Sequence, residues 1–311
     1  MALAAAVIFV AVPAEPQNTQ VRAVKKTFYE ERIAARKASG LRLTIYNTGF
    51  IHARGDEVSS LKSPYSKARM DCPVFLIYHP RQGYILFDVG ISTRMADELN
   101  DALGWRRALN YQSGPGSGIV EQLAVDKIRP EDVRWVILSH LHMDHAGLMD
   151  AFPSAQVIAS RGERRHFKKE KGLRRDYRAI SPADYAGRVQ LALVDLSTAP
   201  PFGSIEHGLD LFSDGSLVLL DLPGYTYGTM GLWAHLDAGP VILAGDAAWL
   251  IDNLMDLALP KKEWITDMEQ YMRSLHALRA LQAAVPRLVI FPGHDLTPRA
   301  LSGRQDLILK P

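Results

Sequence analysis

Short apolar runs separated by turn-forming residues recur along the chain and predict β-strands. The run at 135–138 is continuous rather than alternating, which is typical of a strand buried on both faces. Arg81, Gln82 and Gly83 form a turn that joins two runs as a hairpin. The expected strands are 41–46, 74–78, 84–87, 135–138, 155–159, 217–220, 230–236, 240–244 and 288–291.

Two segments carry apolar residues at helical spacing. Residues 18–37 are highly charged, and we expect a helix there that ends before Gly40. Residues 264–284 form a longer helix, whose stripe of leucine and methionine is typical of core packing. The strands fall into two halves, each accompanied by helices. This order predicts an α/β fold, an αββα sandwich of two mixed β-sheets flanked by helices. We place this domain at 41–311, after a tail and helix at 1–40.

Composition narrows the function classes. The chain has 311 residues, of which 47% are hydrophobic, and a formal net charge of only +2. This balance favours neither nucleic acid nor a membrane surface as a partner. The basic segment 161–178 is best interpreted as a solvated helix and loop, with a basic rim beside a substrate entrance as the alternative. Cys72 is the single cysteine, so any metal must be held by His, Asp or Glu.

The N-terminal segment leaves the location of the protein open. Residues 2–12 are apolar, and Ala14 follows them at a site where a signal peptidase could cut. The segment lacks the basic region of a signal peptide and is too short to span a bilayer. We lean slightly towards the cytoplasm, with export and cleavage within 1–14 as the alternative.

A dense cluster of metal-binding residue types directly follows the strand expected at 135–138. His140, His142, Asp144 and His145 lie within six residues of one another. Imidazoles and carboxylates suit zinc and related divalent ions. One ion cannot easily use all four groups of so short a segment. Two ions roughly 3.5–4 Å apart, as in two-metal hydrolases, are easier to accommodate.

Further ligands are expected at the ends of other strands. Asp246 and His294 both stand beside a glycine where an apolar strand stops. A carboxylate at Asp246 could bridge two ions, and His294 could complete one of the two sites. Alone, either residue would be interpreted as a capping or surface group. Together with the cluster, they predict a metal centre.

These motifs resemble the metallo-β-lactamase superfamily. The segment His140-Leu141-His142-Met143-Asp144-His145-Ala146-Gly147 matches its signature, and Gly245-Asp246 and Pro292-Gly293-His294 are similar to its later metal motifs. Residues 41–49, 87–90 and the helix before His294 resemble the branch that contains N-acyl-homoserine lactonases. The resemblance covers about 41–299. It implies the metallo-β-lactamase fold, zinc as the cofactor and an activity related to quorum quenching.

Two positions depart from the pattern of this family. The family usually has Pro-Gly-His-Thr-Pro-Gly, where this chain has Pro-Gly-Tyr-Thr-Tyr-Gly, so Tyr225 stands at the place of a metal-binding histidine. A phenol is a poor neutral ligand, because its ordinary pKa is about 10. Trp249 stands where related lactonases often have a tyrosine that polarises the substrate carbonyl. The resemblance therefore implies one complete site, formed by Asp144, His145, His294 and the bridging Asp246, and a second, weakened site that retains His140, His142 and Asp246.

The leading functional hypothesis is hydrolysis of a lactone or related ester by a metal-bound hydroxide, with Asp144 also carrying a proton to the leaving group. Thioesterase or β-lactamase-like activity is the alternative. A nuclease is less favoured, since no added substrate-binding domain is evident. A metal-binding relative with a degenerate site is the non-catalytic hypothesis. The expected partner is a small-molecule substrate; the oligomeric state is open, a homodimer included.

Overall fold

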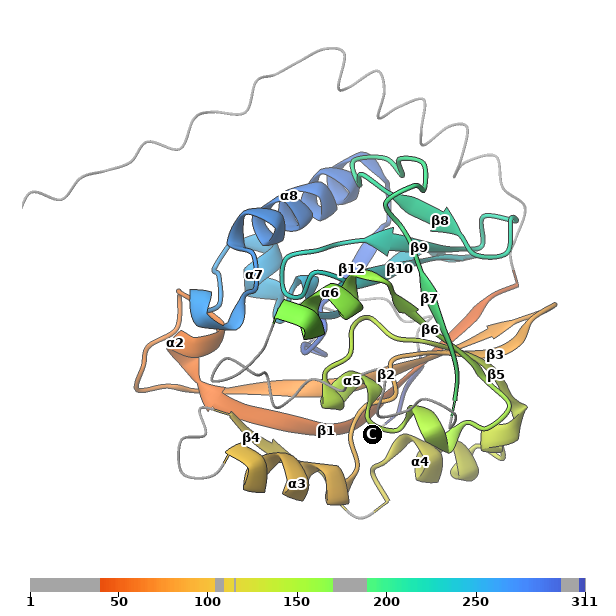
Figure 1. The fold of residues 1–311 in the computed structure, drawn as a ribbon, viewed down its shortest axis with the longest axis horizontal. Helices are drawn as coiled ribbons and strands as arrows, with labels where there is room; N and C mark the ends of the chain where they lie inside the picture. The colour runs from red at the N-terminus through yellow and green to blue at the C-terminus, as the bar shows by residue number, and fades with distance from the viewer. Residues whose placement is uncertain (1–39, 104–108, 115, 170–188, 298–307, 311) are drawn as a thin grey trace, which may run out of the picture.

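The computed structural model describes residues 40–103, 109–114, 116–169, 189–297 and 308–310. The helix expected at 18–37 and the apolar segment 2–12 lie outside these residues, so both stay predictions. Figure 1 shows the described part as a layered sandwich with a sheet in each of its two central layers. The αββα sandwich that the sequence predicts is confirmed.

The first sheet is mixed. Its strands follow one another in the order β13-β1-β2-β3-β5-β6-β7, and β4 also pairs with β1. The pairs from β3 through β7 are parallel, whereas β1 and β3 run antiparallel to β2. The strands are β1 (Arg42–Arg54), β2 (Lys67–His79), β3 (Gly83–Phe87), β4 (Leu109–Gln112), β5 (Val133–Ile137), β6 (Gln156–Ser160), β7 (Gln190–Val194) and β13 (Ile308–Lys310).

The second sheet is formed by the C-terminal half of the chain, in the order β12-β11-β10-β9-β8. Its neighbours are antiparallel except β11 and β12, which are parallel. All four strands expected here form, and β8 is an addition that the sequence pattern did not predict. The strands are β8 (Gly208–Asp210), β9 (Leu217–Asp221), β10 (Met230–Leu236), β11 (Gly239–Leu243) and β12 (Val289–Phe291).

Helices cover the outer face of each sheet. Figure 1 places α3, α4 and α5 along the first sheet and α7 and α8 along the second. Asp267 caps the start of α8 by accepting from the N–H of Gln270. This helix begins four residues later than expected, because 262–264 form a separate 3-10 turn. The helices are α2 (Gly55–Val58), α3 (Thr93–Leu103), α4 (Ile119–Val125), α5 (Met143–Ala146), α6 (Gly162–Lys169), α7 (Ile251–Met255) and α8 (Met268–Ala284).

The apolar runs are continuous because both faces of each sheet are buried. In β2, Phe75 and Ile77 face the second sheet, whereas Val74 and Leu76 pack with the helices on the outside. The same alternation places Leu219 of β9 between the sheets and its neighbours against α8. Side chains of a strand point alternately to opposite faces, so a strand covered on both sides needs apolar residues at every position.

Among the described residues, no helix is both long and apolar enough to cross a membrane.

Candidate metal centre

Strand ends from both sheets converge on the segment 139–147, which follows β5. The N–H of Asp88, just after β3, donates to the carbonyl of Ile137, and the N–H of Met230 donates to the carbonyl of Ser139. The N–H of Ala244, after β11, donates to the carbonyl of Phe291 in β12. These main-chain bonds hold the ends of five strands, β3, β5, β10, β11 and β12, at one edge of the sandwich, which is a rigid platform for a site.

Four buried side chains bring metal-binding atoms close together around the imidazoles of His145 and His294. The Nε2 atoms of His145 and His294 are 3.4 Å apart. Asp246 Oδ1 is 3.3 Å from the first and 3.2 Å from the second, and Asp144 Oδ2 is 3.7 Å from each. A tetrahedral ion with ligands at about 2.0–2.1 Å places its ligand atoms about 3.3–3.4 Å apart. The spacings among His145, His294 and Asp246 match those expected around a tetrahedral divalent ion, and Asp144 lies slightly farther from both nitrogens.

Charge also favours a cation at this point. Burial by itself would raise the pKa of Asp246, but the imidazoles of His294 and His145 outweigh it and hold this pKa well below its usual range. Burial works against protonation of His145, yet Asp246 and Asp144 raise its pKa well above the ordinary value. Buried carboxylates surrounded by imidazoles are favourable when a positive charge lies between them, and a metal ion supplies it.

His140 belongs to a second, overlapping group. Its Nε2 is 3.9 Å from Asp246 Oδ2, and it forms a candidate metal-binding set with His145 and Asp246. Among the described residues this nitrogen has no hydrogen-bond partner although it is fully buried. Burial lowers the pKa of His140 well below the ordinary value, and His145 and His142 lower it further. The ring is therefore neutral, which is the form that binds metal.

His142 lies beside His140 but is not part of either candidate metal-binding set. The two ring centroids are 4.5 Å apart, and the rings are nearly perpendicular. Within the described residues, the two sets contain His140, Asp144, His145, Asp246 and His294 only. The structure thus brings together Asp144, His145, Asp246 and His294, the ligands expected for the complete site. His142 is nearby, but its ligand atom belongs to neither of the two sets.

Asp88 orients His145 from behind. Its Oδ2 is 2.8 Å from His145 Nδ1, which leaves Nε2 facing the other ligands. The same carboxylate accepts from the N–H and hydroxyl of Ser139, at 2.7 and 2.9 Å. Asp88 has a φ of 59°, a left-handed conformation that is uncommon for any residue other than glycine. Carboxylate-to-histidine contacts of this kind fix the ring and increase its basicity as a ligand.

The main chain orients His294. Its Nδ1 is 2.7 Å from the carbonyl oxygen of Asp71 in β2, so its Nε2 also faces the centre. Gly293, the residue before it, packs against the carboxylate of Asp246, and an added Cβ would lie 2.5 Å from Oδ1. The glycine is therefore needed for the close approach of the two strand ends.

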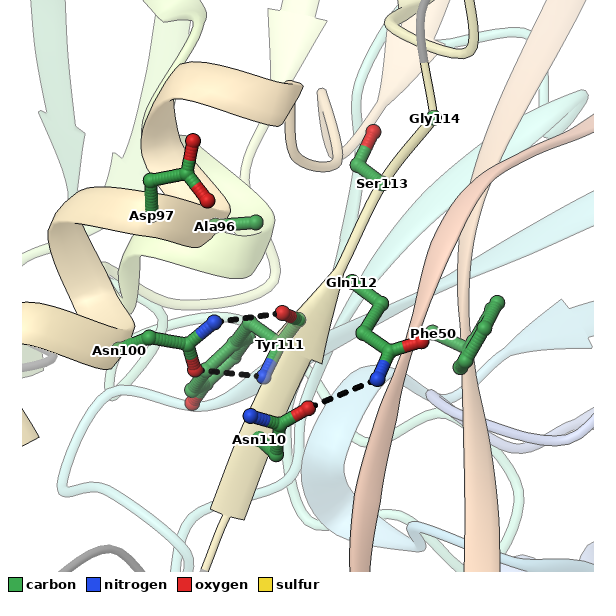
Figure 2. Close-up of a pocket in the computed structure, with 9 residues that line it drawn as sticks. All are labelled: Phe50, Ala96, Asp97, Asn100, Asn110, Tyr111, Gln112, Ser113 and Gly114. Carbon is green, nitrogen blue, oxygen red and sulfur yellow. Dashed lines mark hydrogen bonds between the residues drawn. The ribbon is translucent and has the colours of Figure 1, made fainter. Parts of the chain in front are cut away.

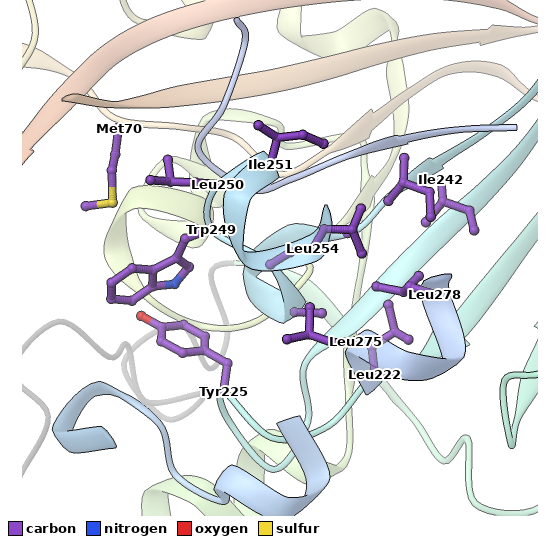
Figure 3. Packing of buried hydrophobic residues seen from close by; sticks show 14 of the residues in the cluster. Met70, Leu222, Tyr225, Ile242, Trp249, Leu250, Ile251, Leu254, Leu275 and Leu278 are labelled. Carbon is purple, nitrogen blue, oxygen red and sulfur yellow. The ribbon is translucent and has the colours of Figure 1, made fainter. Parts of the chain in front are cut away.

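Tyr225 lies beside the imidazoles at the position that the sequence comparison indicated. Its ring centroid is 5.1 Å from those of His140 and His142, and the side chain is 3% exposed. Figure 3 shows its hydroxyl directed towards the indole of Trp249, with Met70 beyond it. The rings of Tyr225 and Trp249 are 5.5 Å apart at 79°. These side chains form an aromatic wall next to the metal-binding residues.

Three residues of the site carry no clear signal in the sequence. Asp88 stands at the end of a predicted strand, but an isolated Asp there is usually a capping residue. Glu163 lies in the basic segment that we interpreted as solvated, yet it is 1% exposed. Ser139 precedes the histidine cluster and links Asp88 to it. Asp88 and Ser139 contact ligand histidines, and Glu163 contacts Leu141 between two of them. Sequence spacing does not reveal such hydrogen bonds.

A separate groove of about 540 Å³ lies between β1, β4 and α3. Figure 2 shows the side chains that line it. Asn100 donates to the carbonyl of Tyr111 and accepts from its N–H, at 2.7 and 2.9 Å, and Gln112 donates to Asn110 at 2.9 Å. These amides satisfy one another within the protein. The groove is therefore better interpreted as a structural feature than as a second site.

Comparison with known families agrees with this geometry. The model of a family described as the metallo-beta-lactamase superfamily matches residues 69–294, which include all the candidate ligands. The chain belongs to the metallo-β-lactamase superfamily. The expected class, a metal-dependent hydrolase, is confirmed by this membership.

Relatives also agree with the resemblance to the lactonase branch. The N-acyl homoserine lactonase AttM of Azorhizobium caulinodans is 26% identical over 82% of this chain and 93% of its own length. The AttM of Agrobacterium fabrum is 25% identical over the same shares. The metallo-hydrolase mfmC of Annulohypoxylon moriforme is 29% identical over 56% of this chain and 47% of its own.

Solved structures share the fold. An N-acyl homoserine lactone hydrolase with N-hexanoyl-L-homoserine bound at its catalytic metal center has a TM-score of 0.67 at 21% identity, over 85% of this chain and 96% of its own. AidC, a dizinc quorum-quenching lactonase, has a TM-score of 0.59 at 17% identity, over 85% and 90%.

The role of Asp88 can be tested by Asp88→Asn. The amide keeps the size of the side chain, but His145 loses the negative charge that it contacts. We expect the affinity for zinc to fall about 10- to 100-fold, as measured by competition with a chelator. The exposed Asp195, which accepts from Ser197, provides the control variant Asp195→Asn. Equal zinc affinity in parent and Asp88→Asn would contradict the assignment.

The effect of Tyr225 can be tested by Tyr225→His. A third imidazole beside His140 and His142 should tighten that site about tenfold or more, because a neutral imidazole binds zinc without first losing a proton, unlike a phenol. Metal titration of both proteins in one buffer measures the change. If the parent already holds two ions tightly and the variant gains neither affinity nor activity, Tyr225 is a ligand or a substrate contact in its own right.

Proposed function

We propose that the protein is a zinc-dependent hydrolase that opens a lactone ring, with N-acyl-homoserine lactones as the best candidate substrates. The convergence of Asp144 and Asp246 on the Nε2 atoms of His145 and His294 carries the metal-dependent part of the proposal. The lactonase relatives, matched over nearly their full length, support the choice of substrate. An enzyme of this kind would act in quorum quenching.

We further propose a second ion, held by His140, His142 and the other oxygen of Asp246. The buried Nε2 of His140 lies 3.9 Å from Asp246 Oδ2 and, within the described part of the chain, has no other group to bond. Tyr225 stands where a third imidazole would complete this set. The second ion is therefore bound more weakly than the first.

Bound ions supply Lewis acidity and lower the pKa of water, which suits the opening of an ester. The remaining chemistry belongs to side chains. Asp144 is 6% exposed, against 1% for Asp246, so it is the more accessible of the two carboxylates. It is placed to accept a proton from the attacking water and to pass it to the alkoxide that leaves when the ring opens.

Trp249 is buried beside the candidate metal centre and offers a hydrogen-bond donor. The main-chain N–H of His294 donates to its carbonyl at 2.9 Å, which holds the main chain of Trp249 beside the centre, and the two rings lie 6.4 Å apart. Its buried Nε1 has no hydrogen-bond partner among the described residues, so it is available to donate to a substrate oxygen. Unlike a phenol, an indole N–H does not ionise in the working pH range. Substrate binding through the indole N–H would therefore not change with pH through ionisation of this group.

Activity on an N-acyl-homoserine lactone tests the proposal. Zinc-loaded protein should release one acid for each ring opened, as measured by pH-stat titration without any nucleotide cofactor. Asp144→Asn, compared at full metal loading, should lower kcat about 10²- to 10⁴-fold, because the amide cannot carry the proton. Unchanged kcat in the loaded variant would remove Asp144 from the mechanism.

A panel of lactones, thioesters, β-lactams and phosphodiesters separates the alternatives. Thioester or β-lactam cleavage without lactone opening would transfer the proposal to that class of hydrolase. A fully metal-loaded protein that is inactive on the whole panel would indicate a metal-binding relative with a degenerate site. Tyr225, at the position of a metal-binding histidine, is the specific reason to consider this alternative.

A further inference from the structure

Glu163 is a buried carboxylate that lies between two segments of the metal centre. It is 1% exposed although it stands at the start of α6, in a highly basic part of the sequence. Its Oε2 accepts from the main-chain N–H of Leu141 at 3.0 Å. Its Oε1 accepts from the hydroxyl of Thr226 at 2.6 Å, and the N–H of Gly228 donates to that hydroxyl at 3.3 Å.

Each contact reaches a residue next to a candidate metal-binding position. Leu141 lies between His140 and His142, so fixing its N–H fixes the main chain that carries both rings. Thr226 directly follows Tyr225, and its own N–H and hydroxyl contact Thr229 at 3.0 and 2.8 Å. Glu163 thus joins the histidine segment to the turn between β9 and β10.

Close packing of glycines permits this contact. A Cβ on Gly162 would lie 2.4 Å from the carbonyl oxygen of Tyr227, and a Cβ on Gly228 would lie 2.4 Å from the N of Glu163. Side chains at either position would push α6 away from the turn. The two backbones approach this closely only because both residues are glycines, and the approach brings the carboxylate within reach of Thr226.

We propose that Glu163 is a positioning residue that holds His140, His142 and Tyr225 in register as one face of the metal centre. It acts through two hydrogen-bonded links, one to Leu141 and one to Thr226, and touches no metal itself. The inference rests on the metal centre of the proposed function. It predicts that Glu163 affects the His140 and His142 site and leaves the site of Asp144, His145 and His294 unchanged.

A carboxylate suits this position because both of its oxygens are acceptors. Burying a charge is costly unless hydrogen bonds compensate it, and here donors come from Leu141 and Thr226. A glutamine could keep both links. Its oxygen would accept from Leu141, and its amide would donate to Thr226, whose hydroxyl can turn to Thr229. An alanine would lose both links.

Cobalt titration of metal-free protein provides the test, because the visible spectrum of bound Co²⁺ reports each site separately from activity. The phase that disappears in His140→Ala identifies the site of interest. We expect Glu163→Ala to weaken that phase about 10- to 100-fold and to leave the other phase within about twofold. Glu163→Gln should recover most of the loss. Thr226→Val should weaken the same phase, with little further loss when combined with Glu163→Ala.

Asp214→Asn is the matched control. The carboxylate of Asp214 also accepts from a main-chain N–H and a hydroxyl, both of Ser216. It stands before β9, at the end of that strand that lies away from the Tyr225 turn. Equal weakening of both cobalt phases, or no weakening in Glu163→Ala, would overturn the proposal. So would an equal loss in Glu163→Gln and Glu163→Ala, or a parent protein without a His140-dependent phase. Lactone hydrolysis does not enter the test, so a wrong substrate would leave its result intact.

Discussion

Two carboxylates buried among imidazoles set the main constraint on this structure. Asp144 and Asp246 are 6% and 1% exposed, and the nitrogens of His145 and His294 lie 3.2–3.7 Å from them. Charges removed from water in this way are costly unless an opposite charge is nearby. Although burial opposes it, Asp246 raises the pKa of both histidines well above the ordinary value, so this group of side chains favours a positive charge. A divalent ion satisfies the same charges with a fixed geometry.

The two-sheet sandwich is rigid enough to keep these charged side chains buried close to one another. Each strand end that delivers a ligand is held by main-chain hydrogen bonds to its neighbours, and the strands behind it are buried on both faces. The ligands therefore cannot relax away from one another without disturbing the core. Asp88 and Asp71 hold His145 and His294 by their outer nitrogens, so that both rings present Nε2 to the same point. Rigidity of this kind is what pre-organises a metal site.

Much of the fold could be predicted from the sequence, because the strands that are covered on both faces are continuous apolar runs. The strands β4, β7, β8 and β13 could not, since they are short and lie at or near sheet edges, where the pattern is weak. The candidate ligands were identifiable because metal binding needs particular residue types at strand ends. Asp88 and Glu163 were not, because their roles depend on hydrogen bonds to groups far away in sequence. That Tyr225 faces the imidazoles was implied by resemblance, whereas its packing against Trp249 required the structure.

The most direct test of this account is a crystal structure of the zinc-loaded protein, with anomalous diffraction measured on both sides of the zinc edge. The account predicts a strong zinc peak about 2.0–2.2 Å from His145 Nε2, His294 Nε2, Asp144 and Asp246. A second, weaker peak is predicted beside His140 and His142. Loaded crystals with no peak among the first four side chains, and with those side chains bonded to one another instead, would contradict the central claim.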